Sequence, residues 1–289
     1  MRRRKSWEEL EIRDNFLFLK VMRKPELCKG LLEKVLHIRI KTLSFLAIEK
    51  PIEIDPASKA VRLDLYVEDE QNRAFDVEMQ ASRPKENDGP LGLRTRYYQS
   101  LMDQRALEKG HRYGDLRETF IIFICAFDPF GKNLRRYTFR EQCLEVPELH
   151  LDDRSTKIFL NALGTIGEED EDIRHFLEYV ARKEPVGAFT QDVAAEVARV
   201  KQHEKTRLEY MSLGMMLDDE YYAGRQEGRQ EGRQEGRQEG WNDCLNTERQ
   251  RMTSTLRQRG FSQEQIIDLM GITPQEYAAL SEANNNDKQ

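Results

Sequence analysis

Two acidic residues fourteen positions apart, Asp64 and Glu78, are the part of this sequence best suited to chemistry. Both lie in the segment 61–80, VRLDLYVEDEQNRAFDVEMQ, in which apolar and polar residues alternate on each side of a polar turn. A period of two predicts a β-hairpin with one apolar and one polar face. If the turn is symmetric about Gln71, Asp64 and Glu78 lie opposite each other on the polar face, with Cβ atoms about 4.5 to 5.5 Å apart.

Two carboxylates placed in this way repel each other, and a divalent cation between them removes the repulsion. Mg²⁺ is typically held by one or two carboxylates and several waters, with the remaining positions left for substrate phosphates. Gln80 follows on the same face and could orient the water that attacks a phosphate. The alternative is that the polar face is simply exposed to solvent, as in many antiparallel sheets.

The hairpin resembles the PD-(D/E)XK nuclease superfamily, in which an aspartate on one strand and an acidic-x-lysine triplet on the next bind metal and activate water. The triplet here is Glu78-Met79-Gln80. Within that superfamily, LDLYVEDEQNRAFDVEMQ is most similar to the Rpn family of recombination-promoting nucleases and transposases. The similarity continues through residues 94–137, RTRYYQSLMDQRALEKGHRYGDLRETFIIFICAFDPFGKNLRRY, and covers roughly residues 11–165.

The resemblance implies an endonuclease that hydrolyses DNA with Mg²⁺, for which Mn²⁺ can substitute. It implies that Asp64 and Glu78 bind the metal, that the backbone carbonyl of Met79 adds a ligand, and that Gln80 positions the attacking water. Two acidic residues rank behind these as ligands, Asp76 on the same polar face and Glu53 on the preceding strand. The family's roles are recombination, movement of mobile elements or defence against foreign DNA.

The glutamine at position 80 departs from the wider superfamily, in which a lysine is usual. A lysine supplies a positive charge that stabilises negative charge developing on the phosphate, whereas a neutral amide does not. The glutamine form is common in the family that this chain resembles. A catalytically inactive protein that binds DNA or regulates with the same fold therefore stays open as an alternative, and the C-terminal part of the chain leaves open a second one, a helical assembly protein.

The charge balance is unusual for a protein that acts on DNA, because a basic surface normally meets the phosphate backbone. The 289 residues carry a net charge of −6, and charged residues make up 34% of the chain. Candidate phosphate contacts are few: the basic residues 2–5, Lys59 and Arg62 beside the candidate metal site, and Arg94, Arg96 and Tyr98 in the segment that follows the hairpin. No apolar run approaches the roughly 18 residues that span a bilayer, and no secretory signal is recognisable, so we expect a cytoplasmic protein without membrane contact.

The apolar pattern predicts an α/β domain over residues 1–167. A helix at 14–36, begun by Asp14 as its N-cap and interrupted at Pro25, precedes a first strand in 43–54 and the hairpin. A helix at 91–109, a buried strand at 119–127 and two candidate strands at 135–146 and 155–163 follow. The order α-β-β-β-α-β matches the shared core of the superfamily that this chain resembles, and the resemblance implies a restriction-endonuclease-like core, which is a central mixed sheet flanked by helices.

The rest of the chain is predicted to be a C-terminal helical extension, with a charged helical region at 168–223 and a tandem repeat at 224–240, GRQEGRQEGRQEGRQEG. As a helix, the repeat costs about 1 kcal/mol for each glycine relative to alanine. It is therefore either a flexible linker or a helix that packs on a partner, such as its own copy in a dimer.

Residues 241–289 resemble a small helix-turn-helix module with a disordered tail, marked by the capping boxes Ser262–Gln265 and Thr273–Glu276. The segment in the place of a recognition helix, PQEYAALSEA, contains no arginine or lysine. This absence of basic donors favours assembly over sequence-specific DNA binding, since base and phosphate contacts need such donors. We expect a homodimer formed through the C-terminal helical region.

Overall fold

The computed structural model describes residues 4–45, 64–86, 89–107 and 112–286. The chain divides into two compact units, residues 1–211 and residues 212–289. The first unit contains the sheet and the candidate site, and the second is helical. In the described part of the chain, no helix is both long enough and apolar enough to cross a membrane.

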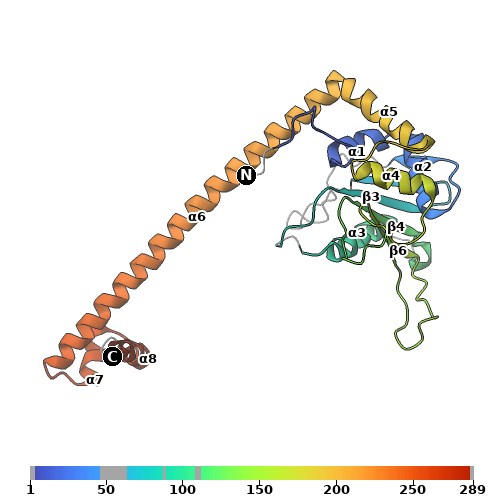
Figure 1. Cartoon of the computed structure of the whole chain (residues 1–289). Coiled ribbons are helices and arrows are strands. Elements are labelled where there is room, and N and C mark those ends of the chain that lie inside the picture. Colours follow the sequence, from blue (N-terminus) through green and yellow to red (C-terminus); the bar gives the residue numbers. More distant parts are fainter. Residues whose placement is uncertain (1–3, 46–63, 87–88, 108–111, 287–289) are drawn as a thin grey trace. The chain divides into compact units, whose positions relative to one another are not determined.

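A six-stranded mixed sheet forms the centre of the first unit (Figure 1), with the strand order β1-β2-β3-β4-β6-β5. The strands are β1 (Leu43–Phe45), β2 (Leu65–Asp69), β3 (Ala74–Gln80), β4 (Thr119–Cys125), β5 (Arg136–Phe139) and β6 (Ser155–Asn161). The pairs β3–β4 and β4–β6 are parallel, and the other neighbouring pairs are antiparallel. The predicted mixed sheet flanked by helices is confirmed.

Helices cover both faces of this sheet. One face packs on four helices, α1 (Asn15–Met22), α2 (Pro25–Leu36), α4 (Glu171–Val180) and α5 (Ala188–Gln202), and the other on α3 (Leu91–Ala106). The predicted interruption at Pro25 separates α1 from α2. Helices α4 and α5 lie beyond residue 167 and still contribute buried residues such as Phe176 and Val193 to the core of the first unit.

Strand β4 is buried along its whole length because it lies between two parallel neighbours and between two helical layers. Its alternate residues enter different clusters, with Ile122 and Ile124 on the α1–α2 side and Ile121 and Phe123 on the α3 side. A continuous apolar run is the sequence pattern that such a strand requires.

The hairpin has the predicted register. Leu65 pairs with Val77 and Tyr66 with Asp76, so the residue before β2, Asp64, comes opposite Glu78. The alternative of a solvated polar face is wrong, because α3 covers this face and buries it.

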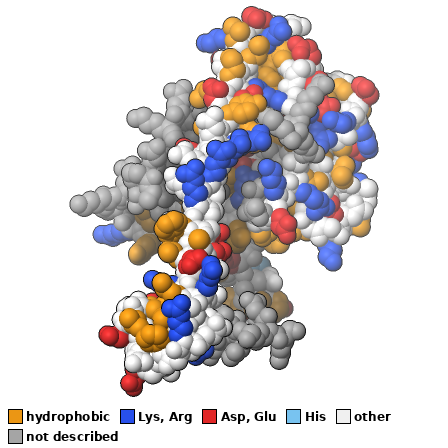
Figure 2. Space-filling view, turned by 90° about the vertical axis from the view of Figure 1, so that its left-hand side faces the viewer, with side chains coloured by type: hydrophobic (Ala, Val, Ile, Leu, Met, Phe, Trp, Pro, Cys, Tyr) orange, Lys and Arg blue, Asp and Glu red, His pale blue; other side chains and the backbone are white. Residues whose placement is uncertain are grey.

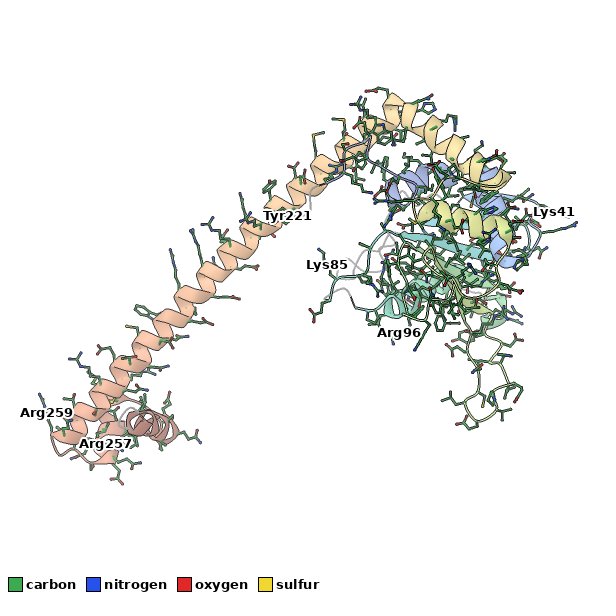
Figure 3. The ribbon with its side chains drawn as sticks, viewed as in Figure 1. Lys41, Lys85, Arg96, Tyr221, Arg257 and Arg259 are labelled. Carbon is green, nitrogen blue, oxygen red and sulfur yellow. The ribbon has the colours of Figure 1, made fainter. Side chains whose placement is uncertain are left out.

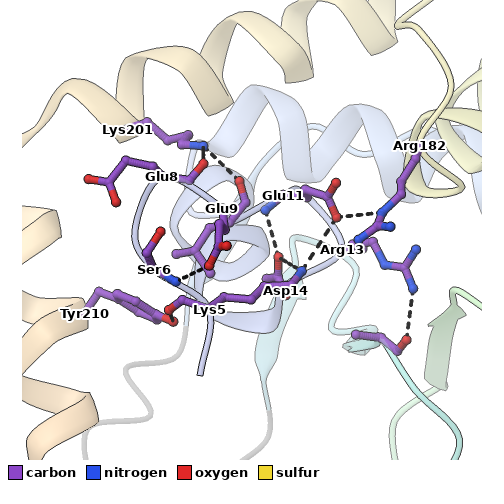
Figure 4. A network of polar contacts seen from close by, with 12 residues as sticks. Lys5, Ser6, Glu8, Glu9, Glu11, Arg13, Asp14, Arg182, Lys201 and Tyr210 are labelled. Carbon is purple, nitrogen blue, oxygen red and sulfur yellow. Dashed lines mark hydrogen bonds and ion pairs between the residues drawn. The ribbon is translucent and has the colours of Figure 1, made fainter. Parts of the chain in front are cut away.

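The segment before α1 is held to the first unit by a network of polar contacts (Figure 4). Lys5 Nζ donates to both carboxylate oxygens of Asp14, at 2.8 and 2.7 Å, and the Glu11 amide donates to Asp14 Oδ2 at 2.8 Å. Asp14 occupies the N-cap position of α1, but its side chain makes no capping hydrogen bond. The predicted cap is therefore replaced by an ion pair that fixes the N-terminal segment.

The second unit contains most of the long helix α6 (Glu204–Gln258), which includes the whole GRQE repeat. Two short helices follow, α7 (Gln263–Met270) and α8 (Pro274–Asn286), and pack on the end of α6 around Ile266 and Tyr277. Both predicted capping boxes are formed. Because the repeat is helical, its glycines form part of a helix surface, and a Cβ placed on any of them meets open space among the described residues, apart from the helix's own adjacent backbone.

Candidate active site

The candidate site lies where the hairpin meets helix α3. Asp76, Glu78 and Gln80 alternate along β3 and share the face that α3 covers, and Asp64 directly precedes β2 on the neighbouring strand. Arg94 reaches this group from the first turn of α3. The strand period of two therefore sets three of the five side chains, and tertiary packing supplies the arginine.

Asp64 is half-buried and is held by contacts from three directions. Its own backbone N–H donates to Glu78 Oε1 at 2.9 Å, and its carboxylate accepts from Asn15 Nδ2 at 2.8 Å. The backbone of Met79 also hydrogen bonds to this carboxylate. Burial nevertheless raises the pKa of Asp64 above its ordinary value.

Glu78 and Asp76 are buried acids, with exposed fractions of 1% and 0%. Burial first, and then repulsion from the neighbouring carboxylates, raises the pKa of each well above its ordinary range. Within the described residues, neither carboxylate oxygen of Asp76 has a hydrogen-bond partner. Buried acids are normally paired, and among the described residues Arg94 is the one cation in contact with this cluster of three carboxyl groups.

Arg94 brings a positive charge to the site. Its guanidinium donates to Gln80 Oε1 at 3.0 Å, to Glu78 Oε2 at 3.3 Å and to the Tyr98 hydroxyl at 2.6 Å. The guanidinium also lies 5.4 Å from the ring centre of Tyr98 and 5.6 Å from that of Phe123. Burial opposes its charge, but Tyr98 and the carboxylates outweigh that effect and raise the pKa of Arg94.

The contact between Arg94 and Gln80 bears on the missing lysine. Because Gln80 Oε1 accepts from Arg94, the amide nitrogen of Gln80 is the end of the side chain that is left to donate. A positive charge thus lies directly beside position 80, but it comes from helix α3. The four-residue spacing of Arg94 and Tyr98 predicts that they share one face of a helix. It does not indicate that this face packs against the sheet.

Comparison with protein families agrees with this geometry. The family model described as PD-(D/E)XK nuclease family transposase matches residues 17–170, which is just over half of the chain. The chain belongs to this family. Neither the curated proteins nor the solved structures gave a match.

A PD-(D/E)XK nuclease generally uses a divalent metal, and the donor set here is suited to one. The fully buried Asp76 carboxylate, which has no hydrogen-bond partner in the described part of the chain, and the Asp64–Glu78 pair are hard oxygen donors, which Mg²⁺ prefers. Among the described residues, no three His, Cys, Asp or Glu side chains form a complete metal-binding group. Two carboxylates completed by waters and substrate phosphates match the usual coordination of Mg²⁺ better than a full protein cage does.

Other predicted contacts of this PD-(D/E)XK domain lie elsewhere. Glu53 and Arg62 fall outside the described residues. Arg96 is on the exposed side of α3, with its side chain in solvent (Figure 3). Tyr98 is buried and its hydroxyl accepts from Arg94, so it positions the guanidinium.

Asn15 was not anticipated from the sequence. It is the first residue of α1, and its amide nitrogen donates to Asp64 across 49 positions of the chain. An asparagine at a helix start normally suggests capping. No local pattern distinguishes such a residue from one that orients a carboxylate on a distant strand.

The buried acids predict an unusual pH dependence for the metal-free protein. A carboxyl whose pKa is raised by folding contributes stability that is fully present below its unfolded pKa and is lost as the pH rises through its folded pKa. The melting temperature in EDTA should therefore rise as the pH is lowered from 8 to about 5. This range lies above the pKa values of unfolded Asp and Glu, which are about 3.9 and 4.3. Asp76→Asn should raise the melting temperature at pH 7, by about 2 to 4 °C for each kcal/mol of repulsion removed.

The matched control is Asp192→Asn, which changes an exposed aspartate on α5. It should leave the melting curve and its pH dependence unchanged. The raised pKa values would be contradicted if the melting temperature of the native protein decreased as the pH was lowered from 8 to 5 and that of Asp76→Asn decreased by the same amount.

Proposed function

We propose that this chain is a Mg²⁺-dependent DNA endonuclease that hydrolyses phosphodiester bonds. The observation that carries the proposal is the convergence of Asp64, Gln80 and Arg94 on the buried Glu78, in a chain of a nuclease family. This arrangement supplies both negative donors for a metal and a cation for the phosphate.

Each residue of the group then has a distinct task. Asp64 and Glu78 would hold the metal, which when bound supplies an acidified water and polarises the phosphate. The backbone carbonyl of Met79 and the carboxylate of Asp76 are the next candidates for ligands. Glu53 is a further candidate on the preceding segment.

Arg94 and Gln80 act on the charge of the reaction. A guanidinium that faces the scissile phosphate stabilises the negative charge that develops there, as a lysine at position 80 would. Gln80, fixed at its oxygen by Arg94, keeps its amide protons for the attacking water or a phosphate oxygen.

The remaining DNA contacts must come from a surface of mixed charge. On the face shown in Figure 2, lysine and arginine side chains are interspersed with acidic and hydrophobic ones. Arg96, exposed on the helix that carries Arg94, and Arg62 are the candidates nearest to the site in sequence. Such a surface favours modest, salt-sensitive affinity, and recombination, transposition and defence against foreign DNA all remain suitable roles.

The direct test is digestion of supercoiled plasmid by the purified chain in Mg²⁺, Mn²⁺, Ca²⁺ or EDTA, with single-stranded DNA and RNA as parallel substrates. We expect nicked plasmid in Mg²⁺ and Mn²⁺ and none in EDTA. An Asp64→Ala protein purified in the same way controls for contaminating nucleases. Cleavage of RNA alone, or of nothing, would contradict the proposal.

We also propose that the chain is a dimer formed through its C-terminal helical region. Apolar side chains of α6 are exposed on both sides of the repeat, including Tyr222 before it with 55% and Trp241 after it with 64% of the residue exposed. Large apolar side chains that recur along one helix mark interaction surfaces more often than single ones do.

A further inference from the structure

The repeat within α6 has a fixed order of side chains around the helix. Its residue types recur every four positions, and all residues from 224 to 240 are exposed. At 3.6 residues per turn, each type forms its own row, which turns by about 40° per repeat. Around the helix the rows follow one another in the order Gly, Arg, Gln, Glu. The glutamine row is therefore flanked by arginines on one side and glutamates on the other, and so is the glycine row.

These charges are not neutralised within the helix. An arginine and its nearest glutamate, such as Arg229 and Glu231, are two positions apart and point in different directions. Residues four apart are identical, so each row stacks like charges. A partner that offers a glutamate row to the arginines and an arginine row to the glutamates would remove both repulsions.

We propose that α6 pairs with α6 of a second copy in parallel orientation, and that the two helices wind around each other so that the turning glutamine rows stay face to face. The proposal gives an orientation and an interface to the dimer proposed above. In a parallel helix pair, the row on the left of the contact line of one helix lies beside the row on the right of the contact line of its partner. Arginines therefore face glutamates on both sides of the seam, whereas an antiparallel pair would set arginine against arginine and glutamate against glutamate.

The apolar residues outside the repeat select the glutamine row as the seam. Exposed apolar side chains of the second unit continue this row at spacings of three, four and seven residues. The row and its continuations are Met215, Tyr222, Gln226, Gln230, Gln234, Gln238, Trp241, Leu245 and Met252. The glycine row lies on the opposite side of the helix and stays outside the interface.

The two apolar ends also fix the register of the pair. Four identical units would allow slips of four residues with no change in the charge pairing. A slip would move Tyr222 and Trp241 away from their own copies and leave apolar surface exposed on each helix. The in-register parallel pair buries both ends and attaches the two nuclease-family units at the same end of the paired helices.

Distances between spin labels on the full-length chain test the orientation. Native Cys244 is exposed on α6, and Cys28 and Cys125 are buried, so Cys143→Ser leaves Cys244 as the accessible thiol. A second protein, Cys143→Ser/Cys244→Ser/Ser212→Cys, carries the label near the other end of the seam. Both labels should lie roughly 10 to 25 Å from their copies, as for helices with axes 8–10 Å apart plus the label arms.

An antiparallel pair centred on the repeat would give about 36 Å for Cys244 and about 60 Å for the second label, at 1.5 Å per residue. Those distances, or a monomer at the concentration of the measurement, would overturn the proposal. The experiment contains no DNA or metal, so a failure of the proposed cleavage activity would leave its result unchanged.

Substitutions on the two rows test the choice of seam by sedimentation. Trp241→Asp should weaken dimerisation at least tenfold, because it places a charge in the apolar end. Gly232→Ala lies on the outer row with open space around it and should leave the dimer intact. Dimerisation that survives Trp241→Asp and is lost in Gly232→Ala would instead place the glycine row at the interface.

Discussion

Glu78→Gln and Asp64→Asn are each expected to lower the rate of DNA cleavage by at least about 10³-fold and to leave the protein folded. Each amide keeps the size of the side chain and removes a charge that a metal requires. The loss of several kcal/mol of metal-assisted stabilisation corresponds to such a factor, since each 1.36 kcal/mol is tenfold in rate. Nicking rates with Mn²⁺, measured beside melting temperatures, give both quantities.

The stability of these variants separates a catalytic role from a structural one. Because Glu78 is buried next to two other carboxylates, removing its charge relieves repulsion, and the melting temperature should stay equal or rise. Glu118→Gln is the matched control, since it changes an exposed glutamate just before β4. Native cleavage rates in both site variants would rule the site out.

Arg94→Gln is expected to lower the cleavage rate by about 10²- to 10³-fold, the usual effect of removing one group that stabilises transition-state charge. Adding Gln80→Lys to Arg94→Gln returns a cation to the same point and should recover part of the rate. In the native chain, Gln80→Lys places an ammonium against the Arg94 guanidinium. The substitution should therefore lower the cleavage rate in the native chain, whereas it should raise the rate in the Arg94→Gln variant. Initial rates of the four proteins form a double-mutant cycle.

The control for this cycle is Arg96→Gln, two positions along α3 with an exposed side chain. Loss of a phosphate contact there should raise KM for DNA in a salt-dependent way and leave kcat nearly unchanged. If Arg94→Gln behaves in the same way as Arg96→Gln, or the second substitution recovers nothing, Arg94 has no role in charge stabilisation.

The parts of the fold that depend on local periodicity were predictable. The alternation in 61–80 gave the hairpin and its register, because a slip of one residue would turn Val77 and its neighbours to the wrong face. The long apolar run gave β4, and Pro25 gave the division between the first two helices. In each case the signal and the element occupy the same few residues.

The environment of the site depends on contacts between distant segments and was not predictable in the same way. Arg94 and Tyr98 form a polar pair on α3, a pattern that suits a solvated face equally well. Only the packing of α3 over β3 decides that this pair meets Glu78 and buries Asp76. Asn15, which belongs to the first helix, shows the same limit.

The GRQE repeat shows where intrinsic propensity fails as a guide. Five glycines cost about 5 kcal/mol in a helix, which favoured a linker as much as a helix. The structure continues the helix through the repeat, with helical sequence before residue 224 and after residue 240. A paired helix would recover the cost from contacts that a single chain does not contain.

In the proposed mechanism, the Asp64–Glu78 pair holds the catalytic metal. Electron paramagnetic resonance of Mn²⁺ tests it directly, by counting ions bound to the native chain and to Asp64→Ala in the presence of a short DNA duplex. We predict at least one Mn²⁺ per native chain that Asp64→Ala no longer binds, with DNA alone as the blank. Equal Mn²⁺ binding by the two proteins would contradict the assignment.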